Sequence, residues 1–106
     1  KPHGPIPPGF RADPDGMLLI GGDRAEALAD VAGDTPLFAY DSAMLAARVA
    51  EWRAAMPANV QLHYAMKANP YAPLLALMGR LVDGFDVASG GELKAALASA
   101  PAFWAV

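Results

Sequence analysis

From Thr35 onward, short apolar runs alternate with longer stretches in which apolar residues recur at helical spacing. The runs are too short for helices and favour strands, and they occupy Thr35–Tyr40, Val60–Met66, and Leu81–Val82 with Phe85–Ala88. Strands that alternate with helices through short loops predict parallel strands joined by right-handed crossovers. Three such units cannot close a (β/α)8 barrel, which needs about 250 residues. The sequence therefore predicts the opening part of a larger α/β architecture.

Two stretches have the spacing of a capping box, in which a short polar side chain begins a helix and an acidic side chain three residues later reaches back to it. The first pairs Asp23 with Glu26, and the second pairs Ser89 with Glu92. Gly33 is expected to end the first helix, because glycine readily adopts the left-handed conformation that follows many helices. The second box is a complete structural explanation for both of its residues.

Another helix is predicted to begin at Asp41 or Ser42 and to end before Pro57, because the residue before a proline disfavours the helical conformation. Its apolar side chains recur on one face, namely Leu45, Val49, Trp52 and Met56. A short, largely buried helix is expected to start near Pro73, which a first helical turn tolerates, and to end at Gly79.

The segment before these units differs in composition. Residues 1–16 are rich in proline and glycine, which predicts an irregular arm. Met17–Ile20 is a short apolar run closed by two glycines, which predicts a strand. We therefore expect an arm over residues 1–16, a strand and short helix over 17–34, and successive βα units over 35–106.

Composition narrows the classes of function. The 106 residues are 55% hydrophobic and 18% charged, which favours a packed core over disorder. The net charge of −3 gives no indication of a nucleic-acid partner. There is no cysteine, which excludes disulfides, thiolate metal sites and cysteine nucleophiles within the chain. No apolar run approaches the ~20 residues of a membrane span and no signal peptide is evident, so we expect a cytoplasmic protein without a membrane partner.

Lys67 is the first candidate for chemistry, because it directly follows a predicted apolar strand. In parallel α/β folds the carboxyl ends of the strands carry the active-site loops. A lysine held among Tyr64, Ala65 and Met66 is expected to be partly desolvated, which disfavours its charged form. A neutral amine can form a Schiff base with a carbonyl group. A solvated loop lysine is the alternative interpretation.

Asp86 lies between Phe85 and Val87 in the last predicted strand. A carboxylate among apolar residues needs a partner, and its neighbours in the chain supply none. A cation across the sheet is therefore expected, and Lys67 is the candidate. The alternative is an aspartate at the strand end that reaches solvent.

Other features indicate structure more than chemistry. Gly90 and Gly91 begin a predicted helix, but no nucleotide-binding fingerprint surrounds them, so close packing or a tight turn is the favoured interpretation. His63 has no ligand partner at metal-binding spacing, and we expect a satisfied structural histidine and no metal site. Trp52, Trp104 and the methionines are expected to fill the core.

Three motifs occur in order along the chain: Thr35-Pro-Leu-Phe-Ala-Tyr-Asp41, Tyr64-Ala-Met-Lys-Ala-Asn-Pro70 and Gly84-Phe-Asp-Val-Ala-Ser-Gly-Gly-Glu-Leu93. With these motifs the chain resembles the alanine-racemase-like, pyridoxal-phosphate-dependent decarboxylases that act on diaminopimelate, ornithine or arginine. The resemblance extends from about Met17 to Leu97. The sequence around Lys67 is also similar to the diaminopimelate-decarboxylase-like enzymes found with exosortase systems.

The resemblance implies an enzyme of two domains that decarboxylates a small amino-acid substrate as a homodimer. One domain is a (β/α)8 TIM barrel, and the other is a β-sandwich that includes the strand at Met17–Ile20. The resemblance implies that Lys67 forms the internal aldimine, a Schiff base, with pyridoxal 5'-phosphate. It further implies that Asp86 lies near this lysine and the cofactor ring, that Ala65 lines the pocket floor, and that Glu92 stands near the cofactor.

The family's other functional groups are not found in these residues: an acidic group for the pyridine nitrogen, a glycine-rich phosphate loop, and a catalytic cysteine from a dimer partner. Ser99–Val106 does not fit the family pattern. The 106 residues alone are not expected to decarboxylate a substrate. Two alternatives stay open, namely a racemase or other enzyme of the same fold, and an inactive fragment or non-enzymatic binding module.

Overall fold

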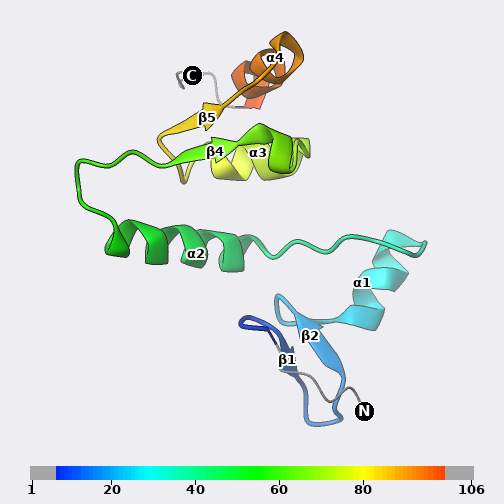
Figure 1. The fold of residues 1–106 in the computed structure, drawn as a ribbon. Coiled ribbons are helices and arrows are strands. Elements are labelled where there is room, and N and C mark those ends of the chain that lie inside the picture. Colours follow the sequence, from blue (N-terminus) through cyan, green and yellow to red (C-terminus); the bar gives the residue numbers. More distant parts are fainter. Residues whose placement is uncertain (1–6, 100–106) are drawn as a thin grey trace. The chain divides into compact units, whose positions relative to one another are not determined.

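The computed structural model describes residues 7–99, which form two compact units that divide between Leu45 and Ala46. Figure 1 shows the order of helices and strands along the chain. The expectations for residues 1–6 of the arm, for Trp104 and for the end of the chain from residue 100 lie outside the described residues. The elements are mixed α/β, as the sequence predicts.

The first unit contains a small antiparallel sheet with the strand order β1–β2–β3. These strands are β1 (Arg11–Ala12), β2 (Leu18–Ile20) and β3 (Asp23–Arg24). Leu19 is the register partner of Arg11 on one side and of Arg24 on the other. The strand predicted at Met17–Ile20 is therefore confirmed, whereas part of the predicted irregular arm forms a strand because β2 supplies it with backbone partners.

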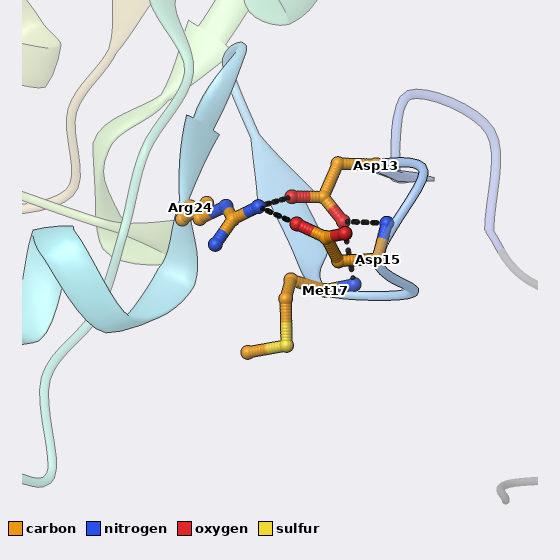
Figure 2. Close-up of polar contacts among 4 residues, drawn as sticks. All are labelled: Asp13, Asp15, Met17 and Arg24. Atoms are coloured by element: carbon orange, nitrogen blue, oxygen red, sulfur yellow. Dashed lines mark hydrogen bonds and ion pairs between the residues drawn. The ribbon is translucent and has the colours of Figure 1, made fainter.

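Polar contacts around Asp13 hold the connection between β1 and β2, as Figure 2 shows. Its Oδ1 accepts hydrogen bonds from the backbone N–H groups of Asp15 (3.0 Å) and Met17 (2.9 Å). Arg24 of β3 forms ion pairs with the carboxylates of Asp13 and, at 2.6 Å, Asp15. The hydrogen bond from Met17 and the nearby Arg24 lower the pKa of Asp13. This network ties the turn to the third strand.

Helix α1 (Ala25–Ala32) begins without a side-chain cap, so the capping box predicted at Asp23 and Glu26 is wrong. Asp23 instead lies in β3, where it pairs with Ile20, and is too early to cap this helix. The predicted end at Gly33 is confirmed: its φ is 74°, and its N–H donates to the carbonyl oxygen of Ala29 at 3.0 Å. Because Asp23 pairs in β3, the helix starts later than the sequence predicts, whereas it ends where the sequence predicts.

The strand predicted at Thr35–Tyr40 does not form: this segment joins neither of the two sheets of the described residues, and its residues are exposed. Phe38 is 89% exposed. Helix α2 (Ser42–Ala55) follows, with Asp41 as its cap: Oδ1 accepts from the N–H groups of Ala43 (2.8 Å) and Met44 (3.3 Å). The predicted start and the stop before Pro57 are confirmed. The expected core position of Trp52 is not, since this side chain is 55% exposed.

The second unit contains the two predicted parallel strands, now shorter: β4 (His63–Ala65) and β5 (Gly84–Asp86). Between them lie the 3-10 turn η1 (Met66–Ala68) and helix α3 (Ala72–Met78), and helix α4 (Gly90–Ser99) follows β5. Pro73 lies in the first turn of α3 and Gly79 ends it, as predicted. The buried apolar residues are Met66, Leu74, Leu75, Met78, Val82, Phe85 and Ala96. The core therefore lies between the strand pair and helices α3 and α4.

The capping box at the start of α4 is confirmed. The Ser89 hydroxyl accepts from the backbone N–H of Glu92 at 3.1 Å. The Glu92 carboxylate reaches back and accepts from the N–H of Ala88 at 2.6 Å, one residue before the cap. Among the described residues, no helix combines the length and apolar character that crossing a membrane would require.

Candidate functional site

The parallel ladder of β4 and β5 has two chemically different faces. Its register pairs His63 with Gly84, Tyr64 with Phe85, and Ala65 with Asp86. Because side chains alternate along a strand, Tyr64 and Phe85 share one face, while Ala65 and Asp86 share the other. The rings of Tyr64 and Phe85 meet edge to face, with centroids 6.2 Å apart. Phe85 is fully buried, so this face joins the core and the face of Ala65 and Asp86 carries the polar group.

Lys67 lies in η1, two residues beyond Ala65, and therefore follows the carboxyl end of β4. The position that the sequence predicts is confirmed, since β4 and β5 are parallel and their carboxyl ends meet at one edge. The predicted partial desolvation is wrong: Lys67 is exposed even though the preceding Met66 is fully buried. The chain turns after β4, which buries one side chain and leaves the next in solvent.

Asp86 is the last residue of β5 and is exposed at the same edge. The expected ion pair with Lys67 does not form; the ion pairs made by residues 7–99 do not include Asp86. The alternative interpretation, an aspartate at a strand end that reaches solvent, fits better. An amine and a carboxylate thus stand at one edge without neutralising each other, and both are available to a bound molecule.

Ala65 and Glu92 occupy different surroundings. Ala65 ends β4, is half-buried, and is the register partner of Asp86. Glu92 lies in the first turn of α4, and its carboxylate is engaged by the N–H of Ala88. Ala65 therefore joins Asp86 and Lys67 at the edge, whereas Glu92 already has a structural role.

The structure also describes the surroundings of His63 and of the paired glycines. One ring nitrogen of His63 lies 3.3 Å from the side-chain oxygen of Gln61. No group of three metal-ligating side chains exists within the part of the chain that the structure describes. Gly90 and Gly91 form the first turn of α4, and an added Cβ would meet nothing within 4 Å at Gly90 and only the Ser89 hydroxyl oxygen, at 3.8 Å, at Gly91, so the predicted close packing is wrong.

A surface cavity of about 390 Å³ lies in the first unit. Apolar residues such as Leu28, Leu37 and Phe38 contribute to its lining. None of the predicted site residues lies in it, because all four belong to the second unit. The chemistry-bearing groups are therefore separate from this cavity.

A polar cluster at the opposite end of the ladder was not predicted. Arg53, in the last turn of α2, donates to Asp83 Oδ2 at 2.5 Å and to the carbonyl oxygen of Leu81 at 3.3 Å. The same Asp83 oxygen accepts from the N–H of Leu62 at 2.7 Å. These contacts lower the pKa of Asp83, with the hydrogen bond from Arg53 as the largest cause. In the sequence, Arg53 is set apart only by lying off the face of its helix on which Leu45, Val49, Trp52 and Met56 recur.

Comparison with known proteins identifies the family to which the chain belongs. A sequence model described as the pyridoxal binding domain of pyridoxal-dependent decarboxylases matches residues 42–102, which include the whole β4–β5 edge. The chain belongs to this family of pyridoxal-dependent decarboxylases. The predicted family and its pyridoxal cofactor are thereby confirmed.

Individual relatives include two amino-acid decarboxylases. The chain is 42% identical over 79 residues to diaminopimelate decarboxylase from Aquifex aeolicus, which covers 74% of this chain and 18% of the relative. It is 36% identical over 72 residues to ornithine decarboxylase from Schizosaccharomyces pombe, 68% of this chain and 16% of the relative.

A third relative has a different named substrate. The chain is 38% identical over 65 residues to 2-[(L-alanin-3-ylcarbamoyl)methyl]-2-hydroxybutanedioate decarboxylase from Staphylococcus aureus, 61% of this chain and 16% of the relative. The chain thus spans less than a fifth of the length of each of these three relatives.

Proposed function

We propose that this chain is the N-terminal part of a pyridoxal-phosphate-dependent amino-acid decarboxylase, in which Lys67 holds the cofactor. The observation that carries the proposal is the edge at which Lys67, Ala65 and Asp86 come together, within the matched domain. Decarboxylation is preferred to racemisation because the relatives described above are decarboxylases. Diaminopimelate and ornithine, the substrates in two of their names, define the class of small amino acid expected here.

The groups at this edge fit the chemistry of pyridoxal phosphate. Its aldehyde needs a primary amine, and Lys67 offers an exposed one. The positively charged ring favours a carboxylate nearby, and Asp86 offers an exposed one without an ion-pair partner among the described residues. When bound, the cofactor supplies an electron sink for the charge left by a departing carboxylate.

The other groups have supporting roles in this proposal. Ala65, the half-buried register partner of Asp86, is proposed to line the pocket floor, where its small side chain would leave room for the ring. Glu92 adds negative charge at the start of α4 while it caps that helix. The protein's share of the chemistry is to orient the amine and to place charge near the ring.

The larger architecture belongs to the same proposal. Strands β4 and β5 with their helices would be the first units of a (β/α)8 barrel over residues 35–106, and β2 would contribute to a β-sandwich domain over 17–34. The homodimer, the cytoplasmic location and the exosortase-associated subfamily stay predictions. The residues that select the substrate are expected in the rest of the protein.

The test is borohydride trapping in the full-length protein. The protein is incubated with pyridoxal 5'-phosphate, reduced, digested and read by peptide mass. A phosphopyridoxyl adduct on Lys67 is expected, and it should vanish in Lys67→Ala but persist in Lys94→Ala, which removes an exposed lysine of α4. An adduct that is absent from Lys67, or that depends equally on both lysines, would refute the proposal.

A second measurement separates decarboxylase from racemase. Full-length protein that forms the Lys67 adduct is loaded with the cofactor, left unreduced, and supplied with diaminopimelate, ornithine or arginine. Carbon dioxide release and loss of optical activity are both followed. Carbon dioxide release is expected. Loss of optical activity without carbon dioxide would favour the racemase alternative.

A further inference from the structure

The contacts of Asp83 join three segments at the amino end of the β4–β5 ladder. Its carboxylate accepts from the N–H of Leu62, and its own N–H donates to the carbonyl oxygen of Leu62 at 2.8 Å. Leu62 immediately precedes β4, and Asp83 immediately precedes β5. Arg53 holds the same carboxylate from the end of α2. Asp83 thus hydrogen-bonds to Leu62, the residue before β4, through both the backbone N–H and the side-chain carboxylate of Asp83.

The edge-to-face contact of Tyr64 with Phe85 also depends on the register, but the backbone ladder itself favours no single register. Each strand has three residues, and parallel backbone hydrogen bonds form equally well in any register. A slip of one residue is opposed, because it would exchange the buried face of Phe85 for the face of Asp86. A slip of two residues keeps both faces, yet it would move Lys67 past Asp86 by roughly 7 Å, two steps of strand rise.

We propose that Asp83, held by Arg53, fixes the register of β4 against β5 and so sets where Lys67 lies relative to Asp86. Asp83 is a positioning residue, since it stands at the opposite end of the strands from the proposed cofactor amine. The link to catalysis rests on the proposed function of Lys67, whereas the register role itself does not.

The register can be read with engineered disulfides in the full-length protein, where residues 1–106 contribute no other cysteine and peptide mass identifies which two residues each disulfide joins. Ala65→Cys with Asp86→Cys joins register partners, and Ala65→Cys with Ala88→Cys joins positions two residues out of register. Neighbouring strands are about 4.8 Å apart, which a disulfide can span. With Asp83 and Arg53 intact, we expect the first pair to oxidise and the second to stay reduced.

Removing the Asp83 carboxylate or its Arg53 partner should change the ratio of in-register to out-of-register disulfide. In an Asp83→Ala background, in-register relative to out-of-register disulfide should fall by roughly tenfold, the factor expected for a lost hydrogen bond to a charged group. Arg53→Met should also lower this disulfide ratio. If Asp83→Ala does not fold, the ratio in Arg53→Met tests the proposal instead. Arg48→Met is the matched control, because Arg48 pairs with Glu51 on the exposed surface of the same helix. An unchanged ratio in the folded variants would overturn the proposal.

A second readout connects the register to the cofactor. The rate of borohydride-trapped adduct formation at Lys67 should fall by roughly tenfold in Asp83→Ala and remain at the parent level in Arg48→Met. If the parent protein forms no adduct at Lys67, the proposed function fails while the disulfide ratio still decides the register role. If the ratio falls but trapping keeps its rate in folded protein, Asp83 fixes the ladder without positioning Lys67, and that part of the proposal is wrong.

Discussion

Ala65 and Asp86 are register partners at the carboxyl end of the parallel pair β4–β5. This relationship brings together two motifs that are about twenty residues apart in the sequence. It also separates the ladder into a face that packs through Phe85 and a face that presents a carboxylate. The proposed cofactor edge therefore depends on the packing of the opposite face.

Replacing Phe85 tests that dependence. Phe85 is fully buried and meets Tyr64 edge to face. Phe85→Ala should lower the free energy of unfolding by about 3–5 kcal/mol, because it removes buried apolar contacts and leaves a cavity. Phe85→Leu should lose clearly less. Denaturant unfolding of the full-length protein measures both, and equal losses would show that the size of this side chain does not matter.

The Ser89 cap predicts a smaller effect. Ser89→Ala removes the acceptor for the N–H of Glu92 and should cost about 1 kcal/mol. Ser89→Asp keeps a capping acceptor and should restore most of this stability. Urea unfolding compares the three proteins. A Ser89→Asp variant as unstable as Ser89→Ala would contradict the capping role.

Replacing a glycine by alanine should have different effects on stability at the ends of two helices, at Gly33 after α1 and at Gly90 in α4. Gly33 has a φ of 74°, so Gly33→Ala should destabilise by about 1–2 kcal/mol. Gly90 begins α4 without a positive φ, and an added Cβ there meets no atom within 4 Å. Gly90→Ala should therefore be neutral or stabilising by about 0.4–1 kcal/mol. Thermal unfolding compares the stability of the two variants with that of the parent. A loss of stability in Gly90→Ala as large as that in Gly33→Ala would contradict this account.

Acid should weaken the ladder through Asp83. Its pKa is lowered in the folded state by the hydrogen bonds from Arg53 and from the N–H of Leu62. A lowered folded pKa gives stability that is fully present above the unfolded value of about 4 and is lost as pH falls through the folded pKa. Asp83→Asn should therefore flatten the fall in stability that the parent protein shows as pH drops below about 4.

The matched control for acid unfolding is Glu51→Gln, which neutralises an exposed acid on α2 whose ion-pair partner is Arg48 of the same helix. Unfolding midpoints recorded across the pH series compare the parent and both variants. A slope that Glu51→Gln flattens as much as Asp83→Asn would assign the acid sensitivity elsewhere.

Local signals predicted most helix ends and the order of elements from Asp41 onward. The caps at Asp41 and Ser89, the stop before Pro57 and the order β4, α3, β5, α4 depend on residues close in sequence. Helix ends are determined by a few neighbouring side chains, so the sequence alone reveals them. The parallel direction followed from the alternation of strands and helices.

The failures concern distant or missing partners. Asp23 has cap-like spacing, but pairing with Ile20 placed it in a strand. Thr35–Tyr40 has strand composition, but a strand needs a neighbour that the described residues do not provide. Arg53 and Asp83 are thirty residues apart, and no local pattern links them. The exposure of Lys67 depends on the turn after β4, which composition does not report.

Because side chains alternate between the two faces of β4, the number of residues from Leu62 to Lys67 is more constrained than which residues they are. Inserting or deleting one residue between Leu62 and Tyr64 would exchange every following side chain between the two faces. Tyr64 would leave Phe85, and the step from Ala65 to Lys67 would begin on the wrong side of the ladder. Length changes here are tolerable only in pairs, so homologues should preserve the parity of this segment even where its residues differ.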